Sequence, residues 1–170
     1  MTSNADATTR IIGSLRSADG KGVVRMEDRF ETDIGDLWSA LTDPLRLARW
    51  YGEIEGDLRL GGEFRERLFA SGWEGTGRVE ACDAPHRLLL TTSQDDDEKH
   101  VIEATLTADG DQTILVVEER GMPVEQVAAY GAGVQIHVED LADHIAGRER
   151  RDAEGRWEEL LPAYRALGVE

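Results

Sequence analysis

The sequence predicts an α+β fold in which a curved antiparallel sheet wraps around one long C-terminal helix. Three observations support this prediction. Two short helix signals follow the first strand, strand-like segments fill residues 53–119, and an apolar helical stripe begins after residues 121–123. An antiparallel sheet with its helices on one face is a recurrent way to enclose a single core. If the sheet curves around the long helix, a cavity remains between them.

The length of the chain indicates one domain, and its charge argues against some classes of partner. The chain has 170 residues with 35 acidic and 19 basic side chains, a formal net charge of −16, and this length suits one domain. Such a chain repels phosphate backbones and anionic lipids, so we expect neither nucleic acid nor membrane partners. The single cysteine, Cys82, excludes an intramolecular disulfide, and the N-terminus lacks the features of a secretory signal. We therefore expect a cytoplasmic protein.

The first 22 residues are expected to form an N-terminal tail with a short extra strand. Residues 1–9 are small and polar, which is typical of disorder, whereas residues 11–15 favour a strand and residues 17–22 (SADGKG) favour a turn. Residues 23–30 then alternate, with Val24, Met26 and Phe30 on one face, which predicts a half-buried strand. We expect the single domain to span residues 23–167.

Two abutting short helices are predicted next. Asp33 has the position of an N-cap, with Asp36 three residues later and apolar residues, Trp38 among them, at helical spacing. Asp43 is expected to cap the second helix, with Pro44 at its first position. Trp38 is assigned to the core.

Residues 53–119 predict an antiparallel meander. The candidate strands are residues 62–70, 73–82, 87–93, 100–107 and 112–119, and turn-forming segments separate them. The acidic run 95–98 is expected to be a solvated loop tip, because it lacks the ligand spacing and glycine of a calcium loop.

The C-terminal region is predicted to be helical. Apolar residues from Val124 to Ile145 follow one helix face, and Gly131 and Gly133 are expected to kink or break that helix. A last short helix follows, which we expect Pro162 to interrupt.

Several segments together resemble a known superfamily. They are residues 37–44 (LWSALTDP), 47–51 (LARWY), 60–64 (LGGEF), 77–79, 84–88 and 110–113. The chain resembles the START-like (SRPBCC) superfamily, and within it the branch named after activators of the ninety-kilodalton heat-shock protein ATPase. The resemblance covers about residues 23–147 and implies a helix-grip fold with a central cavity.

The resemblance leaves the function open, because this superfamily includes lipid carriers, hormone receptors, polyketide cyclases and chaperone regulators. The chaperone activators carry a further N-terminal domain with its own contact motif. The segment before Val23 is too short for that domain, so we do not expect contact with the chaperone.

Two carboxylates interrupt apolar strand faces. Asp28 follows Val24 and Met26, and Glu119 follows Leu115 and Val117. A carboxylate that faces a cavity is costly unless it is paired or bound, so both are candidate ligand-binding residues. The alternative is that both lie at strand ends, in water or paired with an arginine.

Further candidates come from the helices and turns. Trp50, Tyr51 and Trp73 are expected near the rim of the cavity, where they either contact ligand or pack in the core. His137 and Leu141 lie on the long helix and complete the candidate cavity residues.

A metal site is a weaker hypothesis. His137, Asp140 and His144 have helical spacing that would let them share one face, a combination that suits zinc or iron(II). Such spacing is common by chance on polar helices, so we expect no metal and no other cofactor.

The favoured function is binding of a small apolar or amphipathic molecule in the cavity. The alternatives are a cyclase- or dehydratase-type enzyme that uses cavity acid–base residues, and a chaperone-accessory interaction domain. A homodimer is compatible with all three.

Overall fold

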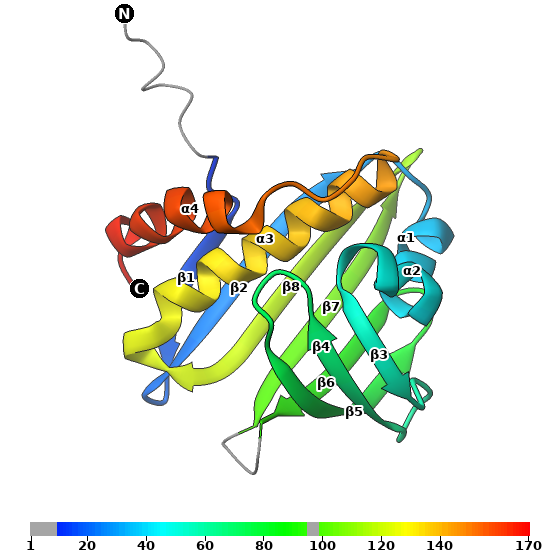
Figure 1. Ribbon diagram of the computed structural model, residues 1–170, viewed down its shortest axis with the longest axis horizontal. Helices are drawn as coiled ribbons and strands as arrows, with labels where there is room; N and C mark the ends of the chain where they lie inside the picture. Colours follow the sequence, from blue (N-terminus) through cyan, green and yellow to red (C-terminus); the bar gives the residue numbers. More distant parts are fainter. Residues whose placement is uncertain (1–9, 95–98) are drawn as a thin grey trace, which may run out of the picture.

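The computed structural model describes residues 10–94 and 99–170 of the chain. Within these residues an eight-stranded antiparallel sheet curves around the long helix α3, as the sequence predicted (Figure 1). The predicted tail 1–9 and the predicted loop 95–98 lie outside the described residues.

The elements follow the predicted order. They are β1 (Gly13–Ala18), β2 (Lys21–Phe30), α1 (Ile34–Thr42), α2 (Pro44–Trp50), β3 (Gly52–Gly56), β4 (Glu63–Leu68), β5 (Glu74–Asp83), β6 (Arg87–Ser93), β7 (His100–Asp109), β8 (Gln112–Pro123), the 3₁₀ turn η2 (Val124–Gln126), α3 (Val127–Ile145) and α4 (Ala153–Leu167).

The sheet has the strand order β1-β2-β8-β7-β6-β5-β4-β3. Strands β4 to β8 form the predicted meander, and β2 pairs with β8 to bring the N-terminal hairpin alongside. Strand β3 was not predicted. It is a short edge strand with the sequence GEIEG, in which Ile54 alone is a large apolar residue, so its alternation is too weak to recognise.

A tight hairpin joins β1 to β2. Its two turn residues, Asp19 and Gly20, have φ angles of 53° and 81°, the left-handed conformation that a two-residue hairpin requires. Strand β1 starts two residues later than predicted and its outer edge is covered by the C-terminus. The backbone N–H of Glu170 donates to the carbonyl of Leu15 at 3.0 Å, and the N–H of Ser17 donates to the carbonyl of Glu170 at 2.9 Å.

The two short helices have the predicted caps. The Asp33 carboxylate accepts a hydrogen bond from the N–H of Asp36 at 2.8 Å, and Asp43 accepts from the N–H of Leu45 at 2.9 Å. Pro44 occupies the first turn of α2, where its missing N–H costs nothing. These caps set the sharp corner that brings α2 to the edge of the sheet.

The predicted break in the long helix is wrong, because α3 continues through both glycines. Gly131 serves a different purpose: a Cβ there would lie 2.8 Å from Cδ1 of Tyr164 and 3.0 Å from Cδ2 of Leu15. The glycine therefore lets α4 and β1 approach the helix closely. The predicted interruption at Pro162 is also wrong, since α4 runs unbroken through it and is held by buried Leu160.

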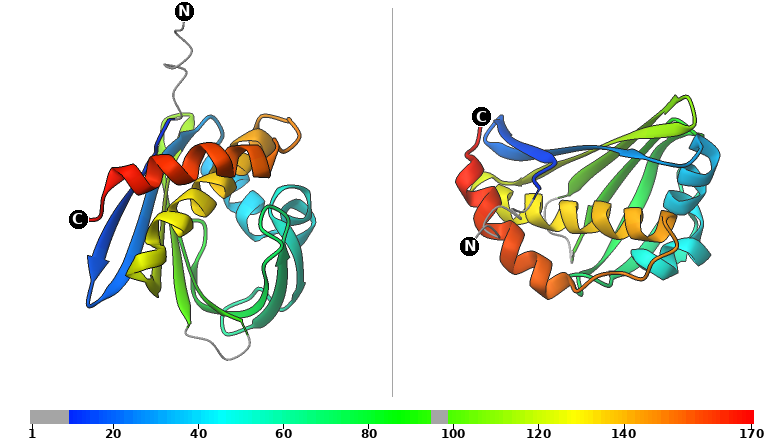
Figure 2. Two further views of the ribbon diagram at one scale, coloured as in Figure 1. Left: turned by 60° about the vertical axis from the view of Figure 1, so that its left-hand side comes forward. Right: turned by 90° about the horizontal axis from the view of Figure 1, so that it is seen from above.

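The curvature of the sheet creates two different environments for α3. Figure 2 shows the strands bending around the helix, with α4 lying along one side of it. On that side α3 packs against β1, β2 and α4, and on the other it faces the strongly curved strands. No helix in the described part of the chain combines the length and apolar character needed to cross a membrane.

Candidate functional site

Two adjoining pockets lie between α3 and the curved part of the sheet. The apolar pocket has a volume of about 140 Å³ and is lined mainly by aliphatic and aromatic side chains of α1, α2, α3 and the strands. The aromatic pocket, of about 370 Å³, includes Trp73, Tyr130 and Trp157. Pockets of this kind, with apolar walls and a few polar groups, are typical of sites for small molecules.

The two pockets adjoin, because they share one wall. Six of the described residues line both pockets, and four of the six are polar. Tyr51 caps the end of α2, and the others come from β4, β7, β8 and α3. The six are Tyr51, Glu66, Ile102, Glu119, Val134 and His137.

Glu66 is the most deeply buried carboxylate of this wall. Its residue is only 3% exposed, on a strand whose alternate residues, Arg65 and Arg67, face solvent. The Tyr51 hydroxyl donates a hydrogen bond to Glu66 Oε1 at 3.2 Å. Burial raises the pKa of Glu66 to about 7, with the nearby charge of Glu119 adding to the rise and the Tyr51 hydrogen bond opposing it. This carboxyl therefore changes its charge near neutral pH.

His137 faces the same wall from α3. Its ring lies 4.9 Å from the Tyr51 ring, centroid to centroid, and its buried Nδ1 has no hydrogen-bond partner among the described residues. Burial, with a smaller contribution from the charge of Arg150, lowers the pKa of His137 to about 4. The imidazole is thus neutral at pH 7 and offers an unused polar nitrogen.

Trp50 is the last residue of α2 and Tyr51 caps it, and both rings pack against their neighbours. The Trp50 indole N–H donates to the carbonyl of Ala40 at 3.0 Å, which ties α2 to α1. The Trp50 and Tyr51 rings are 5.2 Å apart. Burial and the neighbouring carboxylates raise the pKa of Tyr51 well above its ordinary value, so its hydroxyl keeps its proton.

Glu119 lies at the far end of the wall on β8. Its Oε2 is 3.3 Å from Nδ1 of His100 on β7, and the two side chains are largely buried. The His100 ring in turn packs edge-on against Tyr130 of α3, with centroids 5.1 Å apart. These contacts link the carboxylate to the aromatic pocket.

The structure places six of the seven candidate residues around the two pockets. Trp50 and Leu141 line the apolar pocket, Trp73 lines the aromatic pocket, and Tyr51, Glu119 and His137 belong to the shared wall.

Asp28 lines neither pocket. Its carboxylate lies 3.4 Å from the guanidinium of Arg10 and accepts a hydrogen bond from the backbone N–H of Arg29 at 2.9 Å. The carboxylate is therefore paired within the N-terminal region, which explains a charged residue on that strand face without a ligand.

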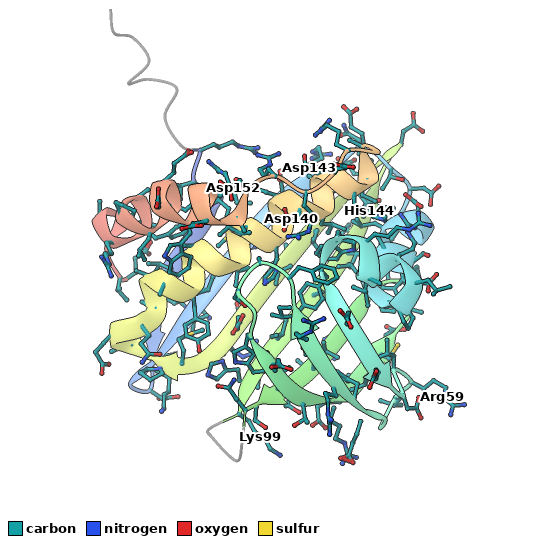
Figure 3. All side chains as sticks on the ribbon, viewed as in Figure 1. Arg59, Lys99, Asp140, Asp143, His144 and Asp152 are labelled. Carbon is teal, nitrogen blue, oxygen red and sulfur yellow. The ribbon has the colours of Figure 1, made fainter. Side chains whose placement is uncertain are left out.

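The three residues of the metal hypothesis have different neighbours. No group of three or more metal-ligating side chains in the described residues is arranged to hold an ion. Figure 3 shows Asp140 and His144 along α3. Asp140 lies 3.8 Å from Arg150, and His144 Nε2 accepts a hydrogen bond from Arg46 at 3.1 Å, whereas the His137 ring packs against Tyr51. Seven residues of helix separate the histidines by about 10 Å along the axis, too far for one ion.

Glu66 in the shared wall and His100 in the aromatic pocket are residues that the sequence analysis missed. A signal for Glu66 exists, because Phe64, Glu66 and Leu68 alternate with arginines along one strand. The same reasoning selected Glu119, so one alternation pattern marks both carboxylates that line the two pockets.

The fold and the pockets define a START-like helix-grip protein. Residues 31–146 match the model of the family described as activator of Hsp90 ATPase homolog 1-like protein, and the chain belongs to this family. No curated protein matches the chain.

Solved structures show the same fold. CalU16 from Micromonospora echinospora is 25% identical with a TM-score of 0.75, and the match covers 91% of this chain and 94% of CalU16. DynU16, from the dynemicin biosynthetic locus, is 28% identical with a TM-score of 0.70, covering 79% of this chain and 50% of DynU16. A conserved protein of unknown function from Enterococcus faecalis, EF2215, is 19% identical with a TM-score of 0.68, covering 92% of each chain, which shows the fold alone.

Proposed function

We propose that this protein binds a small, largely apolar or amphipathic molecule in the two adjoining pockets. The observation that carries the proposal is the shared wall, in which Tyr51, Glu66, Glu119 and His137 converge inside otherwise apolar surroundings. Apolar walls supply binding free energy by excluding water, and a few polar groups orient the ligand.

Two further observations support a ligand. The buried Nδ1 of His137 lacks a partner, whereas buried polar groups in proteins are nearly always hydrogen-bonded. Among the similar structures, DynU16 is a protein of the dynemicin biosynthetic locus, and this setting supports a small-molecule ligand.

A fluorescent probe tests the proposal directly. N-phenyl-1-naphthylamine is apolar and uncharged at pH 7, and its emission rises when it enters an apolar site. We expect saturable binding to the wild-type protein. Ala104→Phe, which places a ring in the apolar pocket, should weaken binding at least tenfold, as expected for a filled cavity.

Ala108→Phe is the matched control, because Ala108 lies on the same strand but is exposed. This variant should bind the probe as the wild type does. Absence of saturable binding, or equal binding by both variants, would contradict the proposal.

A second candidate function is acid–base catalysis, favoured by one observation. Glu66 has a pKa of about 7 and is hydrogen-bonded to Tyr51 within the pocket wall, so it is suited to accept or donate a proton near neutral pH. For any compound that the protein converts, Glu66→Gln should abolish turnover and preserve binding. Unchanged turnover would exclude this role for Glu66.

A further inference from the structure

We infer that the ligand is a cationic amphiphile, an apolar body with an ammonium group that pairs with Glu66 and Glu119 in the shared wall. The inference rests on the proposed function and specifies the chemical class of its ligand. It follows from the charges that face the two pockets and from the arginines that lie beside the other buried carboxylates of this protein.

The pockets are lined by acidic side chains that have no lysine or arginine partner among the described lining residues. Among the described residues that line them, two are glutamates, two are histidines and none is lysine or arginine. His137 is neutral at pH 7 because burial lowers its pKa to about 4. The other histidine, His100, contacts Glu119, with its Nδ1 3.3 Å from Oε2.

Elsewhere in the described part of the chain, buried carboxylates lie beside arginines, although Asp140, 3.8 Å from Arg150, makes no hydrogen bond. Asp143, whose side chain is 4% exposed, accepts hydrogen bonds from Arg148 at 3.1 Å and from Arg151 at 2.9 Å. Glu139, whose side chain is 15% exposed, lies 2.5 Å from Arg156. Because a buried charge is costly unless it is paired, this arrangement is the expected one.

Glu66 departs from this arrangement. It is as buried as Asp143, yet its one hydrogen bond comes from the neutral Tyr51 hydroxyl. Arg150, in the segment between α3 and α4, lies over the Phe69 ring and beside Asp140, and it lines neither pocket. A cationic group of the ligand would supply the positive charge that Glu66 lacks among its described neighbours.

The aromatic side chains favour the same class of ligand. Trp50, Tyr51, Trp73, Tyr130 and Trp157 line the two pockets. The faces of such rings attract ammonium groups, and their bulk also contacts an apolar body. The net charge of −16 additionally attracts cations from solution.

Three probes with the same ten-carbon body separate charge from apolar contact: decylammonium, 1-decanol and decanoate. In calorimetric titrations at pH 8, affinity should decrease in the order decylammonium, decanol, decanoate. Decylammonium should bind at least tenfold more tightly than decanol, as for a charge-assisted hydrogen bond in a buried site. At pH 5.5 this preference should shrink, because Glu66 is then protonated while the amine stays charged.

Variants assign the preference to the wall. Glu66→Gln keeps the size of the side chain, so decanol affinity should persist and show that the pocket is intact, while the preference for decylammonium falls at least fivefold. Glu119→Gln should reduce it as well. Glu55→Gln, which removes the same charge from an exposed position on β3, should leave the preference unchanged.

The outcomes distinguish the two proposals. If decanol binds as tightly as decylammonium, or if decanoate binds best, the cationic ligand is excluded and the binding function stands. An ammonium preference that Glu66→Gln, Glu119→Gln and Glu55→Gln alter equally would come from the overall charge and would also overturn the inference. If none of the three probes binds, both proposals fail.

Discussion

Two polar residues of α3, on different sides of the helix, differ in how completely they are hydrogen-bonded. Gln135 and His137 are two positions apart, and both are polar groups in a largely apolar interior. The buried Nδ1 of His137 has no partner among the described residues. Gln135 is 1% exposed and makes four hydrogen bonds, with Tyr164, Glu139 and the backbone of Arg10 and Ile12.

The difference separates a filled half of the molecule from a hollow half. Where α3 meets β1, β2 and α4, the interior is filled and Gln135 is fully hydrogen-bonded, as in an ordinary protein core. Where α3 faces the curved strands, the interior is hollow and its polar groups are only partly satisfied. Changes in the first half should therefore act on stability, and changes in the second half on ligand affinity.

The largest expected effect is that of Tyr164→Ala. Tyr164 is fully buried and its hydroxyl donates to Gln135 at 2.5 Å, so the substitution removes a core ring and a hydrogen bond. We expect the free energy of unfolding to fall by about 3–5 kcal/mol in urea titrations. Tyr130→Ala, in the wall of the aromatic pocket, should cost less than half as much, and equal losses would contradict the division.

The second expected effect is that Glu66 makes the free energy of unfolding depend on pH. Its pKa rises from 4.5 to about 7 on folding, so the stabilisation from its bound proton is complete below pH 4.5 and is lost as the pH rises through 7. Relative to Glu66→Gln, the wild type should lose about 3 kcal/mol of stability between pH 4 and pH 8.

Urea unfolding of both proteins across that range measures this difference. The opposing contribution of His137, whose pKa is lowered, is present in both proteins and cancels. Glu55→Gln is the exposed control and should track the wild type at every pH. A difference between wild type and Glu66→Gln that does not vary with pH would show that Glu66 is not desolvated.

The smallest effects come from two glycines on α3. A methyl group at Gly131 would lie too close to Tyr164, so Gly131→Ala should destabilise the protein by about 1–2 kcal/mol. A Cβ at Gly133 meets no atom within 4 Å, so Gly133→Ala should stabilise it by about 0.5–1 kcal/mol through helix propensity. Thermal unfolding of the two variants compares them, and shifts of the same sign would contradict the packing described for Gly131.

The sequence predicted most of the fold because its local signals agree with the final structure. The caps at Asp33 and Asp43, the turn at Asp19 and Gly20 and the alternating strands each determine a short segment. The break expected at Gly131 was wrong, because what that glycine accommodates is Tyr164, which lies 33 residues later in the chain. Contacts of this kind leave no local pattern.

The site was predictable where alternation alone places a side chain. This holds for Glu119, and the same rule would have found Glu66. Asp28 also lies on an apolar strand face, but its pairing with Arg10 depends on where the N-terminal segment runs. Trp38 is half-buried and packs against the core, so its assignment was nearly right.

The division of the molecule into a filled and a hollow half is tested most directly by an NMR titration of ¹⁵N-labelled protein with 1-decanol. We predict saturable shift changes at the amides of Ile54, Val117, Val134 and His137, which line the pockets, and none at Leu15, Val24 or Tyr164, which lie in the filled half. The absence of shifts at the pocket residues, or shifts concentrated on β1, β2 and α4, would contradict it.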